Sequence, residues 1–170
     1  AAIDLLKVDP DRADVDLAAW RASSDMLYRE GRLVEAAELG RSQPLQGLNS
    51  LRSAVKAYYH NGVCTTDVWR ESRNKTPPDD ITVVKEARGT TLGAYYRVRP
   101  ILNDYHTALN EVRVIFAAAE IHPGWAPEVL AETGGRIDIT KALGGRVGYH
   151  AFLLVGYDED GFLVLNSWGP

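Results

Sequence analysis

The sequence predicts an α+β fold in which a helical half is followed by a β-rich half. Upstream of residue 80, apolar residues recur at helical spacing, as they do over residues 51–59. Downstream, strand patterns dominate, and the strongest cover residues 149–157 and 162–168. The 170 residues are enough for one domain or for two small lobes that share an interface.

Caps and turn residues divide the helical half. Ser24 is expected to cap a short helix that runs towards Gly31, and a second short helix is expected to end at Gly40. Ser50 is a candidate N-cap for a helix over residues 51–60, which the pair Asn61-Gly62 would stop. Residues 42–49 and 70–80 are rich in polar residues and prolines, so they are predicted to be loops.

The β-rich half is expected to contain four strands and one short helix. Residues 94–98 and 112–121 are predicted to be strands, and residues 103–111 between them form the helix candidate. Residues 149–157 and 162–168 are expected to pair as a hairpin around the turn at residues 158–161. The acids of that turn are interpreted as a solvated loop tip without a catalytic role.

Composition argues against several classes of partner and cofactor. The net charge is −4 and no dense Lys/Arg run occurs, so we expect no nucleic-acid partner. The longest apolar run, residues 114–119, is far too short to span a bilayer. The single cysteine, Cys64, excludes an intrachain disulfide and a multi-cysteine zinc site, and no HxH or HxxxH spacing occurs, so no metal or other cofactor is expected. One cysteine and no visible signal peptide favour a cytoplasmic location.

Two residues of the predicted hairpin are candidates for catalysis. His150 opens the first strand and Asn166 lies near the end of the second. If the turn is centred on Glu159, the two residues are diagonal neighbours on one face of the hairpin, within side-chain reach. If it is centred between Glu159 and Asp160, Asn166 faces away from His150. An asparagine oxygen that accepts a ring N–H fixes the imidazole tautomer without adding charge, an arrangement that serves a thiolate nucleophile.

The same segment resembles the C-terminal half of the papain-like cysteine peptidases. In that family the catalytic histidine precedes a small-apolar strand that ends in Val-Gly-Tyr, here residues 150–157, and the catalytic asparagine lies in Asn-Ser-Trp-Gly, here residues 166–169. The resemblance extends loosely over most of the chain from about Ser23. It implies a helical lobe followed by an antiparallel β-barrel-like lobe with the cleft between them, here residues 1–80 and 81–170, which together make one papain-like domain.

The resemblance also implies roles for particular residues. His150 would be the general base and Asn166 would orient it. Trp168 would cover the bond between them and line the leaving-group side of the cleft. The resemblance also implies that Leu48, Asn49 and Ser50 lie at the substrate-binding edge of the helical lobe. Tyr149 and Ala151 flank the histidine and would border the pocket that selects a substrate side chain.

The family's nucleophile and its oxyanion-hole glutamine have no counterpart in these residues. In the family, a cysteine at the start of the first long helix attacks the substrate. Cys64 instead follows a helix C-terminus, where the helix dipole disfavours a thiolate, so a buried structural role is expected for it. We therefore expect the nucleophile to precede residue 1, both lobes to be incomplete at the chain's ends, and the 170 residues alone to lack peptidase activity.

The sequence thus predicts a peptidase that hydrolyses peptide bonds by a Cys-His-Asn mechanism, with a peptide or protein as its substrate. Two alternatives stay open. One is a non-catalytic papain-fold module that binds peptides or a protein partner. The other is a thiol amidase or transpeptidase on the same fold. The sequence makes no prediction of oligomeric state.

Overall fold

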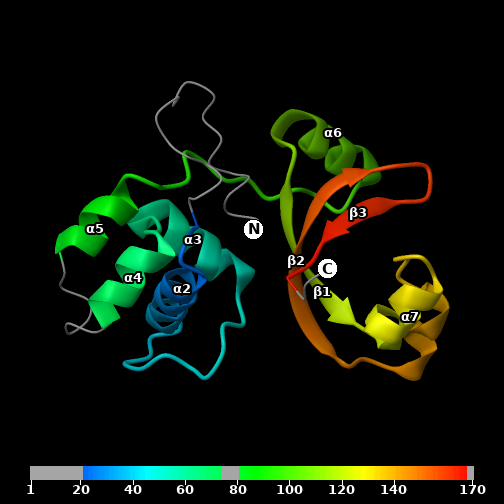
Figure 1. The fold of residues 1–170 in the computed structure, drawn as a ribbon, viewed down its shortest axis with the longest axis horizontal. Helices are drawn as coiled ribbons and strands as arrows, with labels where there is room; N and C mark the ends of the chain where they lie inside the picture. The colour runs from blue at the N-terminus through cyan, green and yellow to red at the C-terminus, as the bar shows by residue number, and fades with distance from the viewer. Residues whose placement is uncertain (1–20, 74–80, 168–170) are drawn as a thin grey trace. The chain divides into compact units, whose positions relative to one another are not determined.

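A computed structural model describes residues 21–73 and 81–167. They fall into two units, Ala1–Pro100 and Ile101–Pro170 (Figure 1). The described helices of the first unit are α2 (Ser24–Glu38), α3 (Leu51–Asn61), α4 (Thr66–Arg73) and α5 (Ile81–Arg88). Helical structure therefore continues past residue 80, where the sequence pattern changes.

Helix α2 is one continuous helix, so the prediction of two short helices that break at Gly31 is wrong. Ser23 is the N-cap, and its hydroxyl accepts a hydrogen bond from the Met26 N–H at 3.1 Å. Gly31 is buried, and a Cβ on it would lie 3.0 Å from the Leu48 side chain. The glycine thus allows the following loop to pack closely on the helix and does not end it.

Helix α3 forms as the sequence predicts. The Ser50 hydroxyl accepts the Ser53 N–H at 3.2 Å at its start. Gly62 ends it with a φ of 73°, a conformation that glycine adopts without steric cost.

Helices α4 and α5 were not predicted. Residues 70–73 of the expected loop belong to α4, and residues 74–80 lie outside the described part of the chain. In α5, Val83 and Ala87 are four residues apart and both are buried. They join the hydrophobic core of the first unit, which explains how a segment with β-branched residues is held as a helix. That core consists of Met26, Tyr58, Val63, Cys64, Trp69, Val83 and Ala87.

The second unit begins with α6 (Leu102–Val112), the helix predicted over residues 103–111. Strand β1 (Ile115–Ile121) starts later than expected because α6 runs to Val112 and Arg113 caps it with a φ of 68°. The strand predicted over residues 94–98 does not form: this segment pairs with no strand, and its Tyr96 is 87% exposed.

The sheet of the second unit has the order β1-β2-β3 in the described residues, with antiparallel pairs throughout. Strand β2 (Gly148–Tyr157) and strand β3 (Phe162–Leu165) form the predicted hairpin. Over the residues described, the sheet is open and not closed into a barrel. Between β1 and β2 lie η1 (Pro123–Trp125), α7 (Pro127–Glu132) and η2 (Ile139–Gly144).

The elements around the sheet occupy its two ends. Figure 1 shows α6 near the β2–β3 turn and α7 beyond the end of β1. The Tyr105 ring of α6 packs edge-on against Phe162, and His106 stacks on Tyr157 with centroids 3.9 Å apart. No helix in the described part of the chain is long and apolar enough to cross a membrane.

Gly62 should tolerate alanine far less well than Gly47, although both have a positive φ. A Cβ at Gly62 would lie 1.7 Å from the Ala87 carbonyl oxygen, whereas a Cβ at Gly47 would meet nothing within 4 Å. Gly47→Ala should cost about 1–2 kcal/mol of unfolding free energy, the backbone cost alone. Gly62→Ala should exceed the usual range for single substitutions, about 0.5–3 kcal/mol. Denaturant unfolding of both variants checks this, and equal losses would contradict it.

Candidate active site

The register of the β2–β3 hairpin changes at one residue. Next to the turn, Tyr157 pairs with Phe162, whereas farther along Leu154 pairs with Val164. Val155 is therefore an extra residue on β2, a β-bulge. The hairpin has the second of the two expected registers at its tip and the first beyond the bulge. Only the first register puts residues 150 and 166 on the same face.

His150 and Asn166 are hydrogen-bonded to each other. His150 Nε2 lies 2.8 Å from Asn166 Oδ1, and both side chains are half-buried. Asn166 directly follows β3, so its position is set by the register that the Val155 bulge restores. The structure thus brings together the two residues that the hairpin argument singled out.

A second hydrogen bond fixes the direction of the first. The Ser167 backbone N–H donates to the same Asn166 Oδ1 at 2.7 Å. Since a backbone N–H requires an acceptor, the atom that faces His150 is the amide oxygen, and Nε2 must be the donor. The neutral imidazole of His150 therefore carries its proton on Nε2, which makes Nδ1 its basic nitrogen.

Small and aromatic residues surround the imidazole. Ala119 on β1 is directly opposite His150, so no bulky cross-strand neighbour displaces the ring. Trp125 packs edge-on to His150 with ring centroids 6.5 Å apart, and it lies 5.2 Å from Phe152, whose ring is 6.3 Å from His150. Sequence reasoning missed Trp125 as a neighbour of His150. The sequence did offer a signal for it: Trp125 follows closely after β1, and the end of β1 pairs with the start of β2, where His150 lies.

A tight turn holds Trp125 in place. His122 precedes η1, and its Nδ1 accepts the Gly124 N–H at 3.1 Å. A Cβ on Gly124 would lie 2.1 Å from the Asp138 carbonyl oxygen, so only glycine fits there. Trp125 itself is buried, with 8% of its surface exposed. The indole is therefore a rigid wall beside His150.

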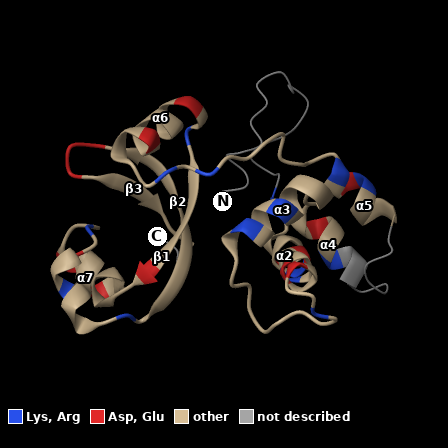
Figure 2. Ribbon diagram, turned by 180° about the vertical axis from the view of Figure 1, so that it is seen from behind, with Lys and Arg blue, Asp and Glu red and all other residues tan. Residues whose placement is uncertain are grey.

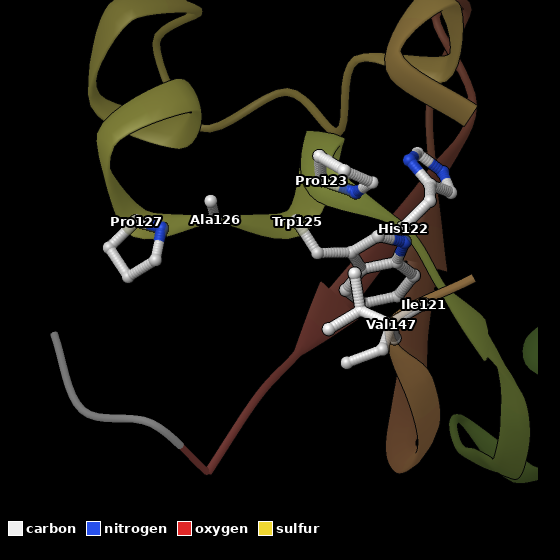
Figure 3. A pocket seen from close by; sticks show the side chains of 7 residues that line it. All are labelled: Ile121, His122, Pro123, Trp125, Ala126, Pro127 and Val147. Carbon is white, nitrogen blue, oxygen red and sulfur yellow. The ribbon is translucent and has the colours of Figure 1, made fainter. Parts of the chain in front are cut away.

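A shallow apolar pocket of about 180 Å³ lies on this turn (Figure 3). Figure 3 shows the Trp125 indole in the middle of the lining side chains, with Val147 beside the indole and Pro123 and His122 above it. Its lining residues are Ile121, His122, Pro123, Trp125, Ala126, Pro127 and Val147.

Tyr149 and Ala151 lie on the face of β2 opposite to His150, because successive strand residues alternate. The Tyr149 hydroxyl donates to the Glu120 carboxylate at 2.8 Å and accepts from Arg146 at 3.0 Å. The Arg146 guanidinium, with help from the Tyr149 hydroxyl, holds the pKa of Glu120 below its ordinary value. The structure does not bring these two flanking residues together with His150 and Asn166.

Leu48, Asn49 and Ser50, the three candidate substrate-binding residues of the first unit, all make contacts within that unit. Leu48 packs against Gly31, and the Asn49 N–H donates to the buried Glu35 carboxylate at 3.1 Å. Ser50 caps α3. Trp168, the last predicted site residue, lies outside the described part of the chain.

Cys64 is sealed inside the core of the first unit, with no exposed surface. Burial, with a smaller contribution from the charge of Glu86, raises the pKa of its thiol to about 11. The backbone N–H of Cys64 donates to the Met26 sulfur at 3.3 Å. This is the environment of a structural cysteine and not of a nucleophile.

The acidic groups of the β2–β3 turn have a local structural role. Figure 2 shows that the β2–β3 turn is acidic. Asp158 in this turn accepts the N–H groups of Asp160 and Gly161 at 2.9 and 3.1 Å, which is the local role expected of a turn residue. Among the described residues, no three His, Cys, Asp or Glu side chains are grouped so that they could hold a metal ion.

A solved structure has the same fold. The chain matches the crystal structure of xylellain, a cysteine protease from Xylella fastidiosa, with a TM-score of 0.70 and 19% sequence identity. The match covers 99% of this chain and 65% of the xylellain chain, so this chain spans less than two thirds of that protein's solved length. No protein-family model and no curated protein matches the sequence.

Asn166→Ala should remove the preference of the neutral His150 ring for the Nε2–H tautomer. In the unsubstituted protein the neutral ring should show the Nε2–H tautomer, because Asn166 Oδ1 accepts that proton. The alanine variant should show a mixture of the two tautomers. The ¹⁵N chemical shifts of the ring at a pH where it is neutral measure this ratio. A dominant Nδ1–H form in the unsubstituted protein would contradict the assignment.

Cys64 should resist alkylation until the protein unfolds. With a pKa of about 11, about one thiol in a thousand is ionised at pH 8. The folded state also holds this proton more tightly than the unfolded chain does. The contribution of Cys64 to stability should therefore decline above the ordinary thiol pKa and be lost as the pH rises towards 11. Iodoacetamide labelling with and without denaturant tests the first point, and fast labelling of the native protein would refute it.

Proposed function

We propose that the protein is a papain-like cysteine peptidase in which His150 is the general base and Asn166 orients it. The observation that carries this proposal is the hydrogen bond from His150 Nε2 to Asn166 Oδ1, with the amide direction fixed by Ser167. It makes Nδ1 the basic nitrogen of a positioned imidazole. The fold shared with a cysteine protease supports the same conclusion.

The chemistry would run through His150 Nδ1. The thiol of a cysteine gives its proton to Nδ1, and the thiolate attacks the carbonyl carbon of the peptide bond. The imidazolium then passes that proton to the departing amine, which leaves an acyl-enzyme thioester. A water molecule gives a proton to Nδ1 as its oxygen attacks the thioester carbon. The carbon–sulfur bond then breaks, the acid product leaves, and the imidazolium passes its proton to the sulfur. Asn166 accepts the Nε2 hydrogen bond throughout and stabilises the positive ring without being protonated itself.

The nucleophile in this proposal comes from sequence before residue 1. The only cysteine of the 170 residues is Cys64, which is buried and has a raised pKa. Residues 1–170 alone would then lack peptidase activity, because the members of such a catalytic set act as a unit.

Other residues of the proposed site have supporting roles. Trp168 would shield the bond between His150 and Asn166 from water, which strengthens it. The segment from Leu48 to Ser50 would bind the substrate backbone. Tyr149 and Ala151, which flank His150 in the sequence, would border the pocket that selects a substrate side chain. The contact of Asn49 with Glu35 supports the first of these roles, since it holds that segment in a defined conformation.

Two alternative functions make different predictions. A non-catalytic module that binds peptides would have serine, alanine or glycine where the nucleophile is expected, and its binding would survive loss of His150. A thiol amidase or transpeptidase would keep the whole catalytic set. It would be recognised by its products when a free amine competes with water for the acyl-enzyme.

The full-length protein, with its upstream sequence, should hydrolyse peptides in a manner that depends on His150. His150→Ala should lower kcat/KM by about 10²–10⁴-fold, the usual contribution of a general acid–base. Asn166→Ala should lose less, because this residue positions the ring and does not transfer a proton. Steady-state kinetics on a peptide library measure both effects.

His60→Ala is the matched control for that experiment. His60 is an exposed histidine in the last turn of α3 and belongs to no proposed site. Its variant should keep full activity. The proposal fails if His150→Ala and His60→Ala have the same activity while both proteins remain folded.

A further inference from the structure

The apolar pocket on the η1 turn shares one wall with the surroundings of His150. Trp125 lines the pocket, and its indole also packs edge-on to the imidazole with centroids 6.5 Å apart. An extended peptide advances by about 3.3 Å per residue. The 6.5 Å between the two ring centroids therefore equals the length of about two extended residues.

The side of the substrate that reaches this wall follows from the chemistry. In the proposed reaction the departing amine takes its proton from His150, so it must lie within hydrogen-bond reach of that ring. The first residues after the cleaved bond consequently pass beside His150 and its neighbours. Of the neighbouring aromatic rings, Trp125 is the one that also lines the pocket.

The lining determines which side chain fits. It consists of aliphatic, proline and aromatic residues, and His122 is the one lining residue with a titratable group. His122 Nδ1 is already engaged by the Gly124 N–H. A charged substrate side chain would lose its hydration here without gaining an ion-pair partner. A large apolar side chain would instead bury its surface against the indole.

We propose that this pocket, built on Trp125, selects a large apolar side chain at the first or second residue after the cleaved bond. The inference rests on the proposed peptidase function and adds the substrate class. Val147 is the best position at which to alter the pocket, because this lining residue is 68% exposed and a substitution there leaves the buried Trp125 wall intact.

The test compares peptide pairs that differ only at the two positions after the cleaved bond, with the full-length protein as the enzyme. Phenylalanine or leucine should give a kcat/KM at least about tenfold above that of serine or aspartate, since about tenfold is the low end of what one apolar group contributes in a pocket. Val147→Lys should reduce this preference and raise the relative rate for aspartate, because it adds a cation at the rim.

Val112→Lys is the matched control. Val112 is 60% exposed and ends α6, where a lysine suits the helix dipole. It should leave the preference unchanged. A second measurement needs no turnover: the indole N–H signal of Trp125, identified by Trp125→Phe, should shift in the NMR spectrum with the product-like peptide Phe-Gly-amide and not with Gly-Gly-amide.

The outcomes separate the two proposals. If hydrolysis depends on His150 but shows no preference after the cleaved bond, or if the two lysine variants behave alike, the pocket assignment is overturned and the peptidase function stands. If no hydrolysis depends on His150, the peptidase function fails, and the pocket assignment fails with it.

Discussion

The site depends on the β-bulge at Val155. Side chains alternate along a strand, so a shift of one residue in the pairing of β2 with β3 would put Asn166 on the face opposite to His150. The turn at Asp158–Gly161 favours one register and the site requires the other. The unpaired residue Val155 allows both registers in one hairpin. The turn therefore keeps its own hydrogen bonds, and the His150 imidazole and the Asn166 amide lie on the same face.

Around that face, the neighbours of His150 are either very small or very rigid. Alanines 117 and 119 on β1 pair with Phe152 and His150, which leaves room for two rings on β2. Trp125 then fills the space above them, held by a turn whose glycine cannot carry a side chain. In the proposed reaction, an imidazole confined in this way would reach the geometry for proton transfer with little loss of side-chain entropy.

The hairpin, α3 and α6 could be predicted because each has a local signature: a cap, a regular spacing or a turn rich in Asp and Gly. The His150–Asn166 pair could be predicted only as one of two registers, because the bulge has no signal of its own in the sequence. Helix α5 was missed because its β-branched residues oppose the helix that its packing against the core imposes. Gly31 was misread as a helix end because the reason for the glycine, the approach of Leu48, lies 17 positions away in the sequence. Trp125 was missed for the same reason: it meets His150 only through the pairing of β1 with β2.

The sealing of Cys64 in the helical core has a consequence for the environments in which the protein can exist. Thiol–disulfide exchange begins with a thiolate that its partner can reach. A fully buried thiol with a pKa of about 11 supplies neither the charge nor the access. Disulfides such as oxidised glutathione therefore meet no reactive thiol in this core unless the core first unfolds. Cys64 therefore packs in the seven-residue core as a small apolar side chain, in reducing surroundings and in surroundings that would oxidise an accessible thiol.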